Sequence, residues 1–514
     1  MEIHETTAAE ENRNLPGKPT TLWFDNTPET HFPVLEKDLL VDTVIVGGGI
    51  AGITTATLLK DAGQRVAVIE ARKIVTGVTG HSTAKITSLH GLIYQHLHSH
   101  FGEEGARVYA DANQTAIETM ASLIETKRIA CDFQKRSAYT YTDTEKDLDK
   151  VAKEVQIARS LGLPASYVEA TSLPFAVKGA ICLTNQAQFH PRKFVLHLAE
   201  ELHKAGCAIF EETRALDIVE GDIVEAITDK GVIRGKKVVV ASHFPFKDPA
   251  FFFARMYPKR SYVLAARIRG TLPDGMFYST SEPYVSVRSH PTDKGDILLI
   301  GGQNHKTGHV RHTSELYRAV ERLARQRFDV ESIEYRWSTQ DNVTLDRVPY
   351  IGRISPLSQH VYVATGFAGW GIAHSMVAAI ILSDAILGRS NPWAMFYDPL
   401  RIKLRDTSKL VTQNLHAVKH LAIERLIASE SFDVKTLPKE AGGVIKAKLK
   451  STAVARDDKG DLHAVSPACT HMKCIVTWND AEQSWDCPCH GSRFSIDGAV
   501  IHGPALKPLE KKAP

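Results

Sequence analysis

The chain has 514 residues, which is too long for a single compact core and predicts two or three domains. Apolar residues make up 43% of it and charged residues 24%, as in ordinary globular proteins, and the net charge of +3 gives no basic surface that would indicate nucleic-acid binding. Residues 1–18 lack the apolar core of a signal peptide, and the longest apolar run, 377–382, is too short to span a bilayer, so we expect a cytoplasmic protein.

The first 40 residues are rich in Thr, Glu and Pro. We expect them to form an N-terminal arm with little regular structure. Within this arm Leu22, Trp23 and Phe24 form a short apolar group that should pack on the body of the protein.

A glycine fingerprint follows the first predicted strand, 41–46, and opens a helix. In the pattern G-x-G-x-x-G the first glycine permits a tight turn, the second lets the backbone approach a pyrophosphate, and the third lets the helix pack closely on the strand. A second strand, 65–69, ends at Glu70, at the spacing where an acidic side chain binds a ribose hydroxyl. The set predicts a dinucleotide site, and the alternative is an ordinary glycine turn in a parallel sheet. The glycines of the pattern are Gly47, Gly49 and Gly52.

In the middle of the chain the predicted elements change from strands and helices to the short strands of an antiparallel sheet. Apolar residues at helical spacing predict a helix over 103–130, and strands are expected at 216–219 and 238–242. Between 255 and 335, short alternating runs broken by Pro and Gly are typical of an antiparallel sheet.

The pattern of strand, glycine turn and helix returns at 361–371, where a predicted strand enters another glycine turn and then an apolar helix. A strand, turn and helix at both ends of the same region indicate one discontinuous domain. We therefore expect a Rossmann-like α/β domain over 41–404, into which an antiparallel-sheet substrate domain is inserted at about 135–180 and 250–340.

Three features together resemble one enzyme group: the early fingerprint, the strand that ends at Ala241 and Ser242, and the run D-x-x-P-x-I-G at 346–352 ahead of the glycine turn. They resemble the D-amino-acid-oxidase and glycine-oxidase group of FAD enzymes. The resemblance implies that FAD is the cofactor. It also implies that the loop 80–85 lies over the flavin. The implied FAD-binding residues are Gly47, Gly49, Gly52, Glu70 and Arg72 for the ADP half, and Gly80, Thr83, Gly366, Gly369 and Gly371 for the flavin.

Members of that group oxidise an amine or amino acid by passing a hydride to the flavin. By this resemblance an Arg of the inserted sheet would bind a substrate carboxylate, for which Arg288 is the best candidate and Arg260 and His305 are weaker ones. A solvated Arg on a strand is the alternative. His81 and Lys85 could tune the flavin or carry substrate protons, although such loop residues are often structural hydrogen-bond partners.

Residues 405–435 are expected to form a linker helix, because 405–428 is amphipathic. Its polar positions include Lys409, His416, Lys419 and Arg425. Packing on the body is the expected role of this helix, and contact with a membrane surface is the alternative.

Four of the seven cysteines lie between residues 469 and 489, which favours a metal site in an otherwise cysteine-poor chain. The other three, Cys131, Cys182 and Cys207, are expected to be buried apolar residues. C-x-H at 469–471 with C-x-x-H at 487–490 would suit a [2Fe–2S] cluster held by two thiolates and two imidazoles, or a zinc ion.

The neighbouring residues, C-T-H-x-x-C and C-P-C-H-G-S-x-F, resemble the Rieske domains of cytochrome bc complexes. The resemblance implies a small all-β Rieske domain over 436–514 with a [2Fe–2S] cluster. It also implies that Cys474 and Cys489 form a disulfide that braces the two cluster loops. The implied cluster ligands are Cys469, His471, Cys487 and His490.

FAD accepts two electrons together, whereas a Rieske cluster carries one. The two resemblances together indicate a dehydrogenase of an amine or amino acid that passes electrons singly through the cluster to an external acceptor, which the sequence does not identify. One alternative is a monooxygenase or demethylase in which the cluster supplies electrons to the flavin. Another is a non-catalytic, redox-responsive electron carrier.

Overall fold

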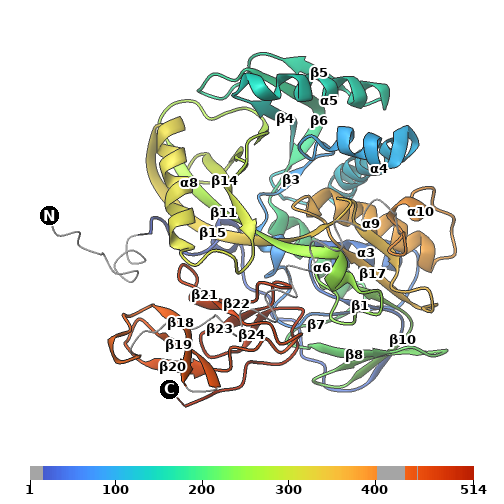
Figure 1. Ribbon diagram of the computed structural model, residues 1–514. Helices are drawn as coiled ribbons and strands as arrows, with labels where there is room; N and C mark the ends of the chain where they lie inside the picture. Colours follow the sequence, from blue (N-terminus) through green and yellow to red (C-terminus); the bar gives the residue numbers. More distant parts are fainter. Residues whose placement is uncertain (1–14, 402–433, 448–449, 514) are drawn as a thin grey trace.

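The computed structural model describes residues 15–401, 434–447 and 450–513. They form three parts, which are a dinucleotide domain, a large mixed sheet and a small C-terminal domain that lies beneath them in Figure 1. The predicted linker helix at 405–435 lies, apart from its last two residues, outside the described residues.

The sheet of the dinucleotide domain has the strand order β16-β17-β10-β1-β2-β7, with β9 on β10 and β8 on β9. β1 pairs in parallel with both β2 and β10, and β17 pairs in parallel with β10, as buried strands rich in Val and Ile favour. The two ends of the expected discontinuous domain therefore meet in one sheet. Its strands are β1 (Leu39–Val46), β2 (Val66–Ile69), β7 (Ala208–Phe210), β8 (Ala215–Val219), β9 (Val224–Thr228), β10 (Val232–Val240), β16 (Tyr350–Arg353) and β17 (Val361–Thr365).

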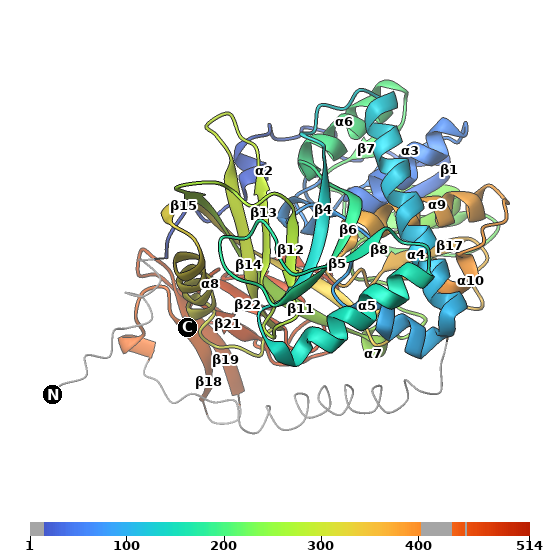
Figure 2. The same cartoon turned by 90° about the horizontal axis from the view of Figure 1, so that it is seen from above.

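Helices cover this sheet, and α3 packs against both α6 and α9. Figure 2 shows α4 beside α9. α4 begins earlier than the sequence predicted and contains a break at Gly102, whose φ is +75°. The helices here are α3 (Ile50–Asp61), α4 (Ile93–Thr126), α6 (Pro191–Lys204), α9 (Gly371–Ile386) and α10 (Ala394–Tyr397), with the short 3-10 helix η1 (Val78–His81). α5 (Leu148–Ser160) and the 3-10 helix η2 (Glu145–Asp147) lie instead with the inserted sheet, where α5 packs on β5 and β6.

The inserted sheet has the strand order β15-β11-β14-β13-β12-β4-β6-β3, with β5 on β6. Most neighbours are antiparallel, as expected, but β12 and β4 are parallel. These two strands belong to different segments of the chain, so no hairpin forces them to run in opposite directions. The strands are β3 (Lys85–Ile86), β4 (Gln134–Thr142), β5 (Ala165–Val168), β6 (Gly179–Gln188), β11 (Met256–Ile268), β12 (Met276–Ser279), β13 (Ser286–His290), β14 (Ile297–Lys306) and β15 (Val330–Thr344).

Three further helices border this sheet. The arm contributes α2 (Leu22–Asp25), and its Leu22 and Trp23 are buried, which confirms that the arm packs on the body. α7 (Phe252–Arg255) precedes β11, and α8 (Ser314–Arg327) packs on β11 and β14.

The C-terminal domain is built from two small antiparallel sheets. Its core is formed by Trp478, Trp485 and Phe494 together with the cysteines. None of the helices in the described ranges combines the length and apolar character needed to cross a membrane. The elements of this domain are η4 (Val434–Thr436), β18 (Gly442–Ala447), β19 (Lys450–Arg456), β20 (Leu462–Val465), β21 (Thr477–Asn479), β22 (Ser484–Asp486), β23 (Arg493–Ser495) and β24 (Val500–His502).

Candidate functional site

One cavity lies where the three parts of the molecule meet. At one end it is lined by the glycine turn after β1 and by Glu70 and Arg72, and at the other by Tyr278, Tyr284 and Trp370. Residues 501–506 of the C-terminal domain form part of its wall. The dinucleotide domain and the C-terminal domain therefore share one site.

The turn after β1 has the geometry that its glycines predicted. Gly47 has a φ of +119°, and a Cβ at this position would lie 2.5 Å from the carbonyl oxygen of Ala241. A Cβ on Gly52 would lie 1.9 Å from the carbonyl oxygen of Gly47, so α3 packs directly on the turn. Gly49 lines the cavity and directly precedes α3, which brings the start of this helix to a place where a phosphate would be stabilised.

Glu70 connects the turn to the following loop. Its Oε2 accepts a hydrogen bond from the backbone N–H of Gly48 at 2.9 Å, and its Oε1 accepts one from the N–H of Arg72 at 3.1 Å. Burial lowers the pKa of the Arg72 guanidinium, which also lines the cavity. Both side chains line the cavity, and their contact with the ADP half of FAD stays a prediction.

The other residues predicted to bind FAD divide into two groups. Thr83, Gly369 and Gly371 line the cavity. Gly80 packs on Phe24, and Gly366 packs on Thr344. The structure therefore places the second group in the packing behind the cavity wall, and their contact with a cofactor stays a prediction.

The two predicted proton carriers differ in position. Lys85 lines the cavity, and its Nζ donates hydrogen bonds to Oγ1 of Thr83 at 3.3 Å and to Oγ of Ser286. Burial, together with the nearby charge of Arg288, lowers the pKa of Lys85 to about 7. The ring of His81 packs edge-on against Phe24, and its Nδ1 lies 2.9 Å from the carbonyl oxygen of Gly77.

Arg288 is fully buried and lies outside the cavity lining. Its guanidinium carbon is 5.5 Å from the ring centroid of Trp23, and its Nη2 donates a 3.4 Å hydrogen bond to the carbonyl oxygen of Phe189. Burial lowers the pKa of Arg288 to about 9. Because the arm covers this arginine, its predicted role in carboxylate binding would need the arm to move.

The two weaker candidates for carboxylate binding also lie outside the cavity lining. Arg260 forms an ion pair with Glu482 of the C-terminal domain. The ring of His305 stacks on Tyr262, with 5.8 Å between ring centroids.

The predicted cluster ligands come together in the C-terminal domain. Cys469 and Cys487 are buried free thiols that share a hydrogen bond, which holds the pKa of Cys469 below its ordinary value. The rings of His471 and His490 lie 5.0 Å apart, and the buried Nδ1 atom of each lacks a hydrogen-bond partner among the described residues. Two thiols beside two unpartnered imidazole nitrogens form the ligand set of a Rieske cluster.

The disulfide implied by the resemblance is present between Cys474 and Cys489. The sulfurs of Cys474, Cys487 and Cys489 lie close enough together to suggest a metal site of their own. Two of these sulfurs are bonded to each other, however, so we assign the ligand role to the free thiols instead.

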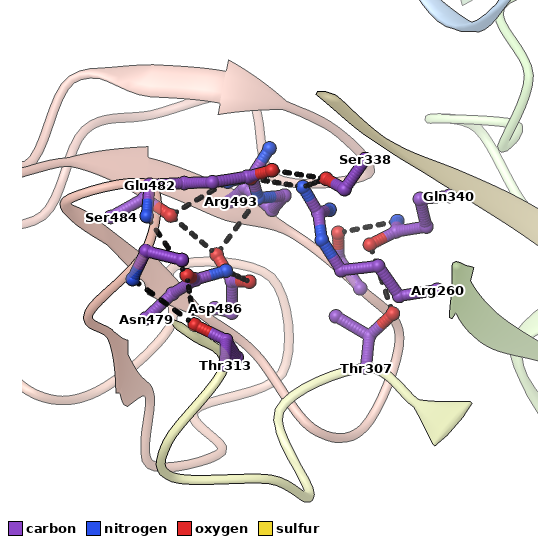
Figure 3. Close-up of polar contacts among 12 residues, drawn as sticks. Arg260, Thr307, Thr313, Ser338, Gln340, Asn479, Glu482, Ser484, Asp486 and Arg493 are labelled. Carbon is purple, nitrogen blue, oxygen red and sulfur yellow. Dashed lines mark hydrogen bonds and ion pairs between the residues drawn. The ribbon is translucent and has the colours of Figure 1, made fainter. Parts of the chain in front are cut away.

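A buried polar network fixes the C-terminal domain against the mixed sheet (Figure 3). Glu482 accepts hydrogen bonds from Arg260 of β11, Ser338 of β15 and Arg493 of its own domain. Burial alone would raise the pKa of Glu482. The charges of the two arginines outweigh burial and lower this pKa to about 2. Nearby, Nε2 of Gln340 donates to the carbonyl oxygen of Gly491 at 2.9 Å.

Phe244 connects the cavity to the cluster loops, and sequence reasoning missed it. This buried side chain lines the cavity, and its ring centroid lies 6.4 Å from that of His471 and 6.5 Å from that of His490. Phe253 approaches His490 as well, at 5.6 Å. The only signal in the sequence was its position two residues after the strand that ends at Ala241 and Ser242.

Residues 42–385, more than half of the chain, match the family of FAD dependent oxidoreductases known as DAO. The chain belongs to this family. Residues 429–513 of this FAD-dependent oxidoreductase match the Rieske [2Fe-2S] domain.

Three similar proteins agree with this assignment. The oxidoreductase is 38% identical to a Bacillus subtilis (strain 168) protein named as a Rieske 2Fe-2S iron-sulfur protein, YhfW, over 96% of this chain and 97% of that protein. It is 21% identical to gamma-glutamylputrescine oxidoreductase of Escherichia coli (strain K12), over 71% of this chain and 88% of the other. Its fold is similar to that of glycine oxidase from Geobacillus kaustophilus, with a TM-score of 0.61 and 20% identity over 71% of this chain and all of that structure.

FAD and a [2Fe–2S] cluster are thus the cofactors of this oxidoreductase. The residues fit both groups. The glycine turn leaves no room for a Cβ at Gly47 or Gly52, and the buried imidazoles have free Nδ1 atoms. Gly47, Gly49, Glu70 and Arg72 would hold the ADP half of FAD. The Rieske match decides between the cluster and zinc.

Proposed function

We propose that this oxidoreductase is a dehydrogenase of an amine or amino acid that passes its electrons singly through the Rieske cluster to an external acceptor. One observation carries the proposal, which is that Phe244 lines the flavin cavity and also contacts both cluster histidines. The similarity to gamma-glutamylputrescine oxidoreductase, whose name gives an amine substrate, supports the substrate class. The acceptor is a one-electron carrier, and the cytoplasmic location stays a prediction from the sequence.

Bound FAD would supply acceptance of a hydride from the carbon beside the substrate nitrogen, and a cluster held by Cys469, His471, Cys487 and His490 would supply transfer of single electrons. Two imidazole ligands in place of two thiolates raise the potential of such clusters to about −150 to +300 mV, which favours electron movement from flavin to cluster. His471 and His490 present this end of the cluster site to Phe244. The side chains of the oxidoreductase therefore support flow in the proposed direction.

The polar network of Figure 3 supports the same proposal. Arg260 and Glu482 join the Rieske domain to β11 of the mixed sheet, and both side chains are largely buried. Removal of one partner from a buried ion pair typically costs about 3–5 kcal/mol, because the other charge is left buried and unpaired, so loss of either residue should loosen this contact. In this docked position, electrons would pass from the flavin to the cluster without a movement of the Rieske domain.

The test is anaerobic mixing of the purified protein with a panel of amines and amino acids, followed by absorbance. We expect flavin bleaching first and cluster reduction second. His490→Ala should abolish the cluster signal, retain flavin bleaching and slow turnover with ferricyanide as a one-electron acceptor. His463→Ala is the control, because His463 lies in the same domain but pairs with Asp457 and Asp497.

Two results would argue against the proposal. If ferricyanide turnover continues at the original rate in His490→Ala, the cluster is not on the path. If no amine bleaches the flavin while chemically reduced cluster passes electrons to it, the alternative direction of the monooxygenase applies.

A further inference from the structure

Two opposite charges lie side by side at the substrate end of the cavity. Lys259 on β11 and Asp341 on β15 are direct partners in the antiparallel register, so their side chains emerge on the same face of the sheet. Both line the cavity. Neither lies in the part of the cavity where the ADP half of FAD was predicted.

The two charges do not neutralise each other by direct contact. In the described part of the chain they form no ion pair with each other, although their fields interact. The ammonium of Lys259 lies over the ring of Tyr284, 5.3 Å from its centroid. Burial lowers the pKa of Lys259, which the charge of Glu282 partly offsets, and it raises that of Asp341 to about 6 although the backbone N–H of Gly369 donates to this carboxylate. A ligand group of opposite charge would therefore stabilise the charged form of each side chain.

Asp341 lies beside the loop predicted to approach the flavin ring. A Cβ built on Gly369 would lie 3.7 Å from its Oδ2. Aromatic side chains border the same space. Tyr278 and Tyr284 stack with 4.5 Å between centroids, and Trp370 lies 5.3 Å from Tyr278. A small molecule held between the two charges would therefore be enclosed by apolar walls next to the reacting ring.

We propose that Lys259 and Asp341 form a binding site for a zwitterion, in which Lys259 binds the carboxylate of an amino acid and Asp341 binds its ammonium group. This inference rests on the proposed function and narrows its substrate class from amines in general to amino acids. It also assigns carboxylate binding to a lysine of β11 in place of Arg288, which Trp23 covers. A cavity meant for a simple amine would need the carboxylate of Asp341 but would gain nothing from Lys259.

The test uses the full-length protein loaded with FAD and cluster, and ligands that differ by one charge. L-Proline carries both charges, pyrrolidine lacks the carboxylate, and tetrahydro-2-furoic acid lacks the ammonium group. Glycine, methylamine and acetate form a second set with a smaller skeleton. Binding is measured anaerobically as a perturbation of the flavin absorbance, and reduction is measured separately as bleaching.

Lys259→Met should weaken binding of the amino acid and of the acid by about tenfold or more, and leave the amine unchanged, because one charged contact is lost. Asp341→Asn should do the reverse, weakening the amino acid and the amine but not the acid. Lys306→Met is the control, because Lys306 is the partner of Lys259 on its other side, on β14, but lies outside the cavity lining. It should change none of these affinities.

The outcomes separate this inference from the proposed function. Binding of amino acids with the predicted charge pattern but without bleaching would overturn the dehydrogenase and retain the zwitterion site. Bleaching whose dependence on ligand concentration is unaltered by either substitution would retain the dehydrogenase and overturn the site. Tightest binding by the amines, or no perturbation by any amino acid of the two sets, would also overturn it.

Discussion

Glu70 acts on the backbone at two points, because its carboxylate accepts hydrogen bonds from the N–H groups of both Gly48 and Arg72. Glu70→Ala should therefore lower the FAD content of the purified protein, since both the predicted ribose contact and the shape of the turn would be lost. The ratio of flavin to iron, measured by absorbance and iron analysis, checks this. Glu70→Gln keeps one acceptor oxygen and should lose less FAD, and an unchanged FAD content in Glu70→Ala would disprove the role.

Lys85 gives the oxidoreductase a predicted pH dependence. Its pKa is lowered to about 7, so the amine is protonated below that pH and neutral above it. If neutral Lys85 accepts the substrate proton, the rate of flavin bleaching should rise through about pH 7 and then level off. Lys85→Met should remove this inflection. A variant that keeps the inflection would show that another group carries the proton.

At the level of single residues, the sequence indicates which chemical role a side chain could have better than it indicates where that side chain lies in the fold. The predicted cluster ligands could be expected to lie together, and Glu70 could be expected beside the glycine turn, because their spacing is set by short local turns. The sequence predicts Arg288 as a carboxylate-binding residue because it lies on a strand of the inserted sheet, but its surroundings depend on Trp23, which is far away in the sequence. Lys259 and Asp341 gave no signal, since only the register of β11 with β15 makes them neighbours.

The N-terminus of α8 is capped by another domain. Its own N-cap, Thr313, makes no capping hydrogen bond, whereas Oδ1 of Asp480 accepts hydrogen bonds from the N–H groups of Thr313 at 2.7 Å and of Ser314 at 3.2 Å. The carboxylate also lies at the positive end of the helix dipole. A loop of the C-terminal domain therefore caps α8, the helix that packs on the mixed sheet.

Asp480→Ala should lower the free energy of unfolding by about 1–2 kcal/mol, the usual effect of a lost helix cap. Chemical unfolding followed by visible circular dichroism of the cluster measures this loss. Asp480→Asn keeps the acceptor oxygen and should have a smaller effect. Asp458→Ala, an exposed position in the same domain, should have almost none, and an equal loss in both alanine variants would contradict the capping role.

Some helices and strands could be predicted from local sequence patterns, and others could not. The glycine turn and the parallel strands could be predicted because hydrophobic runs and turn residues lie within a few positions of each other. The boundaries of α4 could not, since its first turns, before Gly102, are held by tertiary packing of Ile93, Tyr94 and Leu97. The parallel pairing of β4 with β12 depends on how two distant segments meet.

For the molecule as a whole, the proposed electron path from flavin to cluster gives a prediction at Phe244. Phe244→Ala would leave a gap between the cavity and the two imidazoles, so cluster reduction should become slower relative to flavin bleaching. Rapid mixing under anaerobic conditions separates the two phases. Phe246→Ala is the matched control, because Phe246 also lines the cavity but makes no ring contact with either cluster histidine among the described residues.

In this experiment FAD content and cluster spectrum should stay the same in both variants. Equal slowing by both substitutions would indicate general loosening of the loop. An unchanged rate in Phe244→Ala would show that electrons take another path.

Both domains could be identified from the sequence, but their arrangement could not. Motifs depend on local spacing, whereas docking depends on complementary surfaces such as Arg260 with Glu482 and Gln340 with Gly491. These residues occur in ordinary strands and loops without a distinguishing pattern. The sharing of one cavity by the flavin and Rieske parts is therefore visible only in three dimensions.

The wall that residues 501–506 contribute to the cavity has a consequence for the biosynthesis of the protein. All other residues that line the cavity precede residue 376, so the ribosome completes them well before this wall exists. FAD could bind during that interval, before docking of the finished cluster domain adds this wall to the cavity. Cells short of iron or sulfide should for this reason accumulate a form that also loses flavin, so that the supply of one cofactor governs the retention of the other.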